Sequence, residues 1–150
     1  MSIAPEFVWL NRQRAVRPSQ LRLADTQTAV ERAWPLVVEA ERRGSFLKRL
    51  PEISFVLVSD ARIAALHDEF MRDPTPTDVI TFHHGEIVIS AETAHREARR
   101  RALPLPGELA RYAVHGLLHL AGWSDTDPGE AADMRAIQEK ILRRALRGVC

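Results

Sequence analysis

The sequence has very little cysteine and contains no long apolar segment. The single cysteine, Cys150, has no partner within the chain, so no disulfide can form between its own residues, and a reducing compartment is favoured. No apolar run approaches the roughly 20 residues that a membrane-spanning helix needs. The first residues also lack the basic and then apolar pattern of a secretory signal. We therefore expect a soluble, cytoplasmic protein.

Lysine is also scarce, and arginine takes its place. Lys48 and Lys140 are the only lysines among 21 basic residues. The formal net charge is only +1, so the total charge indicates no partner. The planar guanidinium of arginine can donate two parallel hydrogen bonds to one phosphate, so clusters of arginine are candidates for contact with nucleic acid. The 45% of hydrophobic residues is enough for a core, and the length predicts a single domain over residues 1–150.

The apolar patterns predict an α+β fold, in which a small mixed sheet packs against several helices. Strands are predicted at residues 7–10, 53–58, 79–82 and 86–89, and the last two form a hairpin that turns at Gly85. Helices are predicted at residues 26–43, 60–71, 91–101, 108–121 and 128–147. Pro35 indicates a kink or a division in the first helix. A break of the chain is expected around Pro104, Pro106 and Gly107.

Two histidines stand four residues apart in the helix predicted at 108–121. This spacing places the imidazoles of His115 and His119 on one face, about one turn apart, where both can bind one metal ion. Gly122 then allows a sharp turn that brings Asp125 back toward them. Two imidazoles and one carboxylate leave a position open for water, which is the composition of a catalytic zinc site.

The same residues also have a purely structural interpretation. Histidines at this spacing occur in helices without any metal, and the polar residues 124–127 all qualify as caps for the following helix. Asp127 directly precedes Pro128, and proline favours the first position of a helix. Asp127 is therefore the better cap, which leaves Asp125 free to bind a metal.

Three ordered blocks of the sequence resemble the YbeY family of bacterial metal-dependent endoribonucleases. They are VHGLLHLAGW at 114–123, PTDVITF at 76–82 and GEIVIS at 85–90, and the resemblance extends from Ile53 to Leu142. It implies one Zn2+ ion per chain and an endoribonuclease specific for single-stranded RNA. It further implies a role in rRNA maturation and ribosome quality control, with rRNA precursors and the ribosome as partners.

The chain departs from the family at the third ligand and at a substrate residue. The family has a histidine where this chain has Asp125, although a carboxylate is also an established zinc ligand. The family arginine before the P-T-D segment, thought to serve the RNA, aligns with Met71. Arg72 is its neighbour and becomes the candidate cation for stabilising charge on the phosphate.

Two other functions remain open. A zinc metalloprotease carries a glutamate directly after the first histidine as general base, and in this chain Gly116 stands there. A protease would therefore need its base elsewhere. The second alternative is a non-catalytic ribosome- or RNA-binding factor with an altered metal site. Metal analysis of the purified protein would distinguish this factor from an enzyme.

Arginines gather near the end of the helix predicted at 91–101. Arg96, Arg99 and Arg100 either lie in solvent, where they complement the helix dipole, or contact RNA phosphates. We treat them as candidate RNA-binding residues. Trp123 stands beside the ligand turn, and anchoring that turn in the core is favoured over stacking on a base.

Overall fold

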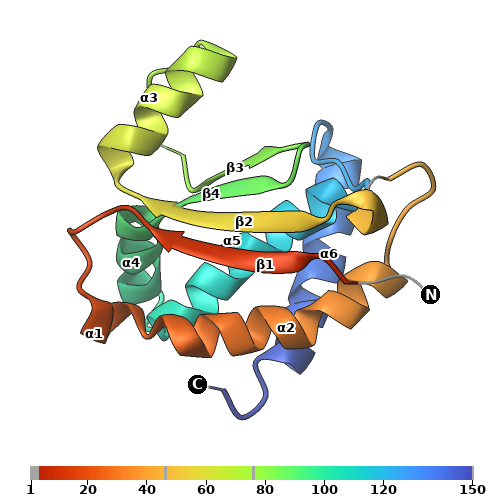
Figure 1. Cartoon of the computed structure of the whole chain (residues 1–150), viewed down its shortest axis with the longest axis horizontal. Coiled ribbons are helices and arrows are strands. Elements are labelled where there is room, and N and C mark those ends of the chain that lie inside the picture. The colour runs from red at the N-terminus through yellow and green to blue at the C-terminus, as the bar shows by residue number, and fades with distance from the viewer. Residues whose placement is uncertain (1–3, 46, 76, 150) are drawn as a thin grey trace.

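The computed structural model describes residues 4–45, 47–75 and 77–149. Within these ranges the chain forms β1 (Glu6–Asn11), α1 (Pro18–Leu21), α2 (Leu23–Glu39), a short 3-10 helix (Leu47–Arg49), β2 (Glu52–Val58), α3 (Asp60–Met71), β3 (Val79–Phe82), β4 (Glu86–Ser90), α4 (Ala91–Arg100), α5 (Leu105–Leu120) and α6 (Pro128–Ala145) (Figure 1). The predicted α+β fold is confirmed. None of the described helices combines the length and apolarity needed to cross a bilayer.

The described strands form one mixed sheet in the order β1-β2-β4-β3. β1 and β4 both pair with β2 in parallel, whereas β3 pairs with β4 antiparallel. The predicted hairpin is therefore present, and its Gly85 has φ +105°. A Cβ atom at Gly85 would lie 2.7 Å from the carbonyl oxygen of Glu52, so both the turn and the close approach of β2 favour glycine there.

The two faces of the sheet are covered by different helices. Successive side chains of a strand point to opposite faces, so the apolar residues of β2 and β4 divide into two sets. Phe55, Leu57, Ile87 and Ile89 belong to the larger core, which α2, α4, α5 and α6 share. Val56, Val58 and Val88 belong to a smaller cluster with Ile63 of α3. Figure 1 shows α3 standing apart from the helices of the larger core.

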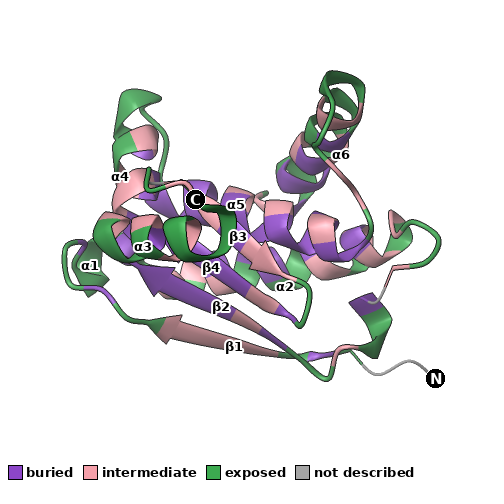
Figure 2. Ribbon diagram, turned by 90° about the horizontal axis from the view of Figure 1, so that it is seen from above, coloured by how far each residue is buried: buried purple, intermediate pink, exposed green. Residues whose placement is uncertain are grey.

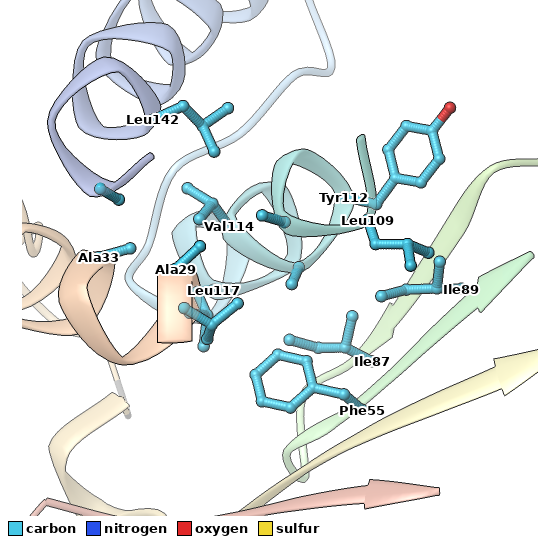
Figure 3. Packing of buried hydrophobic residues seen from close by; sticks show 14 of the residues in the cluster. Ala29, Ala33, Phe55, Ile87, Ile89, Leu109, Tyr112, Val114, Leu117 and Leu142 are labelled. Atoms are coloured by element: carbon cyan, nitrogen blue, oxygen red, sulfur yellow. The ribbon is translucent and has the colours of Figure 1, made fainter. Parts of the chain in front are cut away.

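Helix α5 lies at the centre of the larger core. Figure 3 shows Leu109 and Leu117 of α5 near Ile87 and Phe55 of the sheet, with α2 and α6 on the helix's other sides. Burying a leucine contributes roughly 1.5–3 kcal/mol, and most residues of α5 are buried. The few side chains of α5 that reach the surface therefore project from a firmly held helix.

Several boundaries differ from the sequence-based expectations. The break expected at Pro106 and Gly107 is wrong, because α5 already begins at Leu105. Pro106 takes an early position in the helix, where a missing N–H costs nothing. Pro35 does not divide α2, which is one helix. Pro35 has no N–H to donate to the carbonyl of Glu31. Both residues lie on the exposed face of α2, so this carbonyl is open to water.

Three helices begin with a side-chain cap, and the cap predicted at Asp127 is confirmed. Ser59, Ser90 and Asp127 precede α3, α4 and α6, and each side chain accepts a hydrogen bond from a backbone N–H three residues later. Because Asp127 caps α6, its carboxylate is committed to the backbone of Glu130, at 2.9 Å. Asp125 takes no part in this cap.

Candidate metal centre

Helix α5 and the turn that follows it bring His115, His119 and Asp125 together. The two Nε2 atoms lie 3.1 Å apart, and each is 3.5 Å from Oδ2 of Asp125. Among the described residues these three offer ligand atoms that all lie within 4.8 Å of one another. The arrangement matches the expectation that the turn folds the carboxylate back over the two imidazoles.

The hydrogen bonds of the Nδ1 atoms fix the orientation of both imidazoles. His115 Nδ1 lies 2.9 Å from Oε1 of Gln138, and His119 Nδ1 lies 3.1 Å from the carbonyl oxygen of Trp123. Gln138 donates its amide hydrogen to Glu139, so its Oε1 atom is the one that accepts. Both partners accept hydrogen bonds, so both Nδ1 atoms carry the proton. The Nε2 atoms are left with lone pairs that point at one another.

This donor set fits a cation. Two nitrogen lone pairs and a carboxylate oxygen face one point, and their mutual repulsion is relieved when a positive ion lies between them. Burial, and then the neighbouring His115, lower the pKa of His119, which favours the neutral imidazole that metals bind. Nitrogen and carboxylate ligands suit Zn2+.

The turn that carries Asp125 is anchored to the end of α2. The indole Nε1 of Trp123 donates to the carbonyl oxygen of Ala40 at 2.9 Å, and the guanidinium of Arg42 lies 4.6 Å from the centre of the ring. The backbone N–H of Arg42 also donates to Ala121, at 2.8 Å. The expected anchoring role of Trp123 is thus what the structure shows.

Gly116, between the two histidines, faces the sheet and not the metal centre. A Cβ atom at this position would lie 2.7 Å from Cγ2 and 2.8 Å from Cδ1 of Ile87. A zincin needs its glutamate base at the corresponding position. In this fold any side chain there would point into the core, so the geometry argues against the metalloprotease alternative.

The close contact at Gly116 leads to a prediction about stability. We expect Gly116→Ala to lower the free energy of unfolding by about 1–3 kcal/mol, because the added methyl overpacks the core against Ile87. In an Ile87→Ala background the same change should instead raise stability, since the methyl then fills vacated space and alanine favours a helix. Urea unfolding of the wild type, the two single variants and the double variant measures both effects. An equal cost of Gly116→Ala in the two backgrounds would contradict the contact.

A cleft of about 850 Å³ opens beside the metal centre. Figure 2 shows α4 and α6 rising on either side of α5, and residues of all three helices line the cleft. His115 and Asp125 lie in this lining. A ligand as large as a nucleotide therefore has access to the centre.

Comparison with known proteins identifies the family. The family described as Endoribonuclease YbeY matches residues 18–146 of the sequence. This chain belongs to that family. The Endoribonuclease YbeY of Gluconobacter oxydans is 37% identical over 124 residues, with 79% of this chain and 73% of the relative covered. The one of Heliobacterium modesticaldum is 35% identical over 141 residues, with 76% and 84% covered.

The predictions of the YbeY family and of an enzyme of the endoribonuclease class are thereby confirmed. A solution structure of a protein from Thermotoga maritima resembles this chain with a TM-score of 0.60 and 22% identity. The match covers 93% of this chain and 88% of the other. This likeness concerns the fold alone.

The candidate substrate residues of this YbeY chain lie in different places, and only one of them lines the cleft. Arg96 lines the cleft, but its guanidinium is held by Asp60 at 2.6 Å. Arg99 and Arg100 are absent from the described lining, and Arg100 pairs with Glu97 of its own helix. Arg72 ends α3 with φ +55° and is likewise absent from the lining. The cations predicted for substrate contact thus do not meet at the metal centre.

The sequence-based reasoning missed the polar residues that α6 brings to this site. Gln138 holds His115, and Arg135 lines the cleft one turn earlier. One signal was present. The buried stripe of α6 contains Met134, Ile141 and Ala145, and Gln138 is the polar residue within it. A buried amide in an apolar stripe requires a partner, and here that partner is the imidazole of His115, a candidate metal ligand.

Proposed function

We propose that this chain is a metal-dependent endoribonuclease that cleaves single-stranded RNA, chiefly rRNA precursors. In this proposal residues 1–150 form one domain and bind one Zn2+ ion through His115, His119 and Asp125. The main support is the convergence of two oriented imidazoles and a carboxylate at an open cleft. The family supplies the reaction class, and the ribosome and the cytoplasm are the partner and the location that we propose with it.

The residues of the chain have distinct tasks in this activity. Gln138 and the Trp123 carbonyl keep the imidazoles in the tautomer whose Nε2 atoms face the centre. Asp125 supplies negative charge at the mouth of the cleft, where it is 45% exposed and within reach of water. When bound there, zinc supplies the Lewis acidity that activates water and polarises a phosphoryl oxygen. The walls of the cleft position the RNA.

The choice between the two aspartates of the turn is testable. We expect Asp125→Ala to lower zinc content and RNA cleavage, because it removes one of three ligands. Asp127→Ala is the matched control, since it removes only the cap of α6, at a cost of about 1 kcal/mol of stability. Zinc content after dialysis and cleavage of a single-stranded RNA are measured side by side.

The outcomes separate the possibilities. Full zinc in Asp125→Ala with loss of zinc in Asp127→Ala would show that the wrong aspartate was assigned. A wild-type protein that binds zinc and RNA but cleaves no RNA would favour the non-catalytic RNA-binding factor. A wild-type protein without affinity for zinc would contradict the proposed centre itself.

A further inference from the structure

The charges that line the cleft do not by themselves attract RNA. The described lining contains the arginines Arg96, Arg101, Arg111 and Arg135, and it contains the carboxylates Asp78, Glu97, Glu108, Asp125 and Glu139. Carboxylates thus outnumber arginines. A polyanion such as RNA needs a cation that is not already neutralised by its neighbours.

Most of these arginines are already paired. Arg111 binds Glu108 at 2.8 Å and Glu139 at 3.0 Å, and Arg101 lies 3.7 Å from Glu97. The Asp60 carboxylate holds Arg96, as described above. If one of these arginines turned toward a phosphate, it would leave a carboxylate unpaired beside the RNA. The repulsion between this carboxylate and the phosphate offsets the gain from the new contact.

Arg135 differs from the other arginines of the cleft. Within the described parts of the chain, its guanidinium has neither a hydrogen bond nor an ion pair with any other residue. Its side chain is exposed on the first half of α6. It is free to bind a phosphate without breaking a contact.

Arg135 also lies close to the metal centre. It precedes Gln138 by three residues, so the two side chains share one face of α6, with Cβ atoms roughly 5–6 Å apart. Gln138 in turn contacts His115 at 2.9 Å. Helix α6 begins directly after the turn that carries Asp125, so Arg135 lies between Gln138 and that end of the helix.

We infer that Arg135 binds the RNA phosphate next to the metal centre and is the substrate cation that the sequence suggested at Arg72. This inference rests on the proposed endoribonuclease function. A guanidinium donates two parallel hydrogen bonds to phosphate oxygens and stays charged at any relevant pH. The contact is with the backbone, so it should not depend on the RNA sequence.

The test compares Arg135→Gln with Arg143→Gln in the zinc-loaded protein. Arg143 is an exposed arginine near the other end of α6 that has no described side-chain partner and is absent from the cleft lining, so it controls for the loss of one positive charge. Binding of fluorescent single-stranded RNAs of different sequence is followed by anisotropy, before measurable cleavage, over a range of salt concentrations. Cleavage rates, zinc content and thermal midpoints are recorded on the same samples.

Arg135→Gln is expected to weaken RNA binding about tenfold, the value of one charge-assisted contact, and equally for all sequences. The salt dependence should flatten by roughly 0.7 in slope. Arg135→Lys should keep most of that slope, because it keeps the charge. Zinc content and thermal midpoint should not change, and Arg143→Gln should bind RNA as the wild type does.

The proposed function and the inference fail in different ways. If the wild type binds and cleaves RNA and Arg135→Gln behaves like Arg143→Gln, the inference about Arg135 is wrong and the function stands. If the zinc-loaded wild type neither binds nor cleaves RNA, the function is wrong and the inference falls with it. A loss of zinc in Arg135→Gln would show an effect on the centre itself and would also overturn the inference.

Discussion

Replacement of His119 by alanine is expected to abolish stoichiometric zinc and RNA cleavage together. The imidazole supplies one of two nitrogen ligands, and its Nε2 atom lies 3.1 Å from that of His115 and 3.5 Å from Asp125. The two groups that remain would lie on separate segments and bind a metal only weakly. Zinc per chain after dialysis, measured by metal analysis, and cleavage of a single-stranded RNA are the two readouts.

The fold should survive this change. The His119 side chain is 24% exposed and lies at the edge of the core, and the hydrogen bond to the backbone that it loses, to the Trp123 carbonyl, is worth about 1 kcal/mol. His95→Ala on α4 is the matched control, because His95 is also a partly exposed helical histidine but does not belong to the group of three candidate ligands. Retention of one equivalent of zinc in His119→Ala would refute the site.

Replacement of Arg111 by methionine is expected to cause the largest loss of stability among the charged residues of the cleft, about 3 kcal/mol or more. Glu108 is only 1% exposed, and its second oxygen, Oε2, is buried without a partner among the described residues. Arg111 is therefore the cation that balances this buried charge. Its bonds to Glu139 and Glu108 raise the pKa of Arg111, so it stays charged.

A double variant tests the origin of this loss. Removal of both members of a buried pair is far less costly than removal of one. We therefore expect Glu108→Gln to recover at least half of the stability that Arg111→Met loses, because no uncompensated charge then remains. Glu139→Gln is the control, since Glu139 is 36% exposed and can be hydrated without its partner. Denaturant midpoints in urea give the comparison, and equal instability of the single and double variants would rule out this explanation.

Much of the fold is encoded in local signals that the sequence displays. The hairpin follows from two short apolar runs around Gly85, and the caps follow from a serine or an aspartate at the start of a helix. The placement of the two candidate ligand histidines on one face follows from their spacing on α5. Each of these features depends on neighbours within a few residues, so the local pattern is sufficient to predict it.

The remaining features depend on contacts between distant segments. Phe70 at the end of α3 is 58% exposed although its ring lies 5.1 Å from that of Phe82 in β3, and this position depends on how α3 docks on the sheet. The roles of Gln138 and Arg135 depend on how α6 docks against α5. The pairing of Arg96 with Asp60 depends on the contact between α3 and α4. No local pattern contains these arrangements.

The anchoring of the metal-ligand turn to α2 also determines when the centre can form during folding. Trp123 and Ala40 are separated by 83 positions, and His115 and Gln138 by 23. Closing long loops costs entropy before the contact is gained, so we expect these contacts to form only when α2, α5 and α6 dock. An unfolded or nascent chain therefore presents two histidines without the orientation that gives them affinity. We therefore expect affinity for the proposed zinc ion to be a property of the completed fold, with zinc binding after folding instead of guiding it.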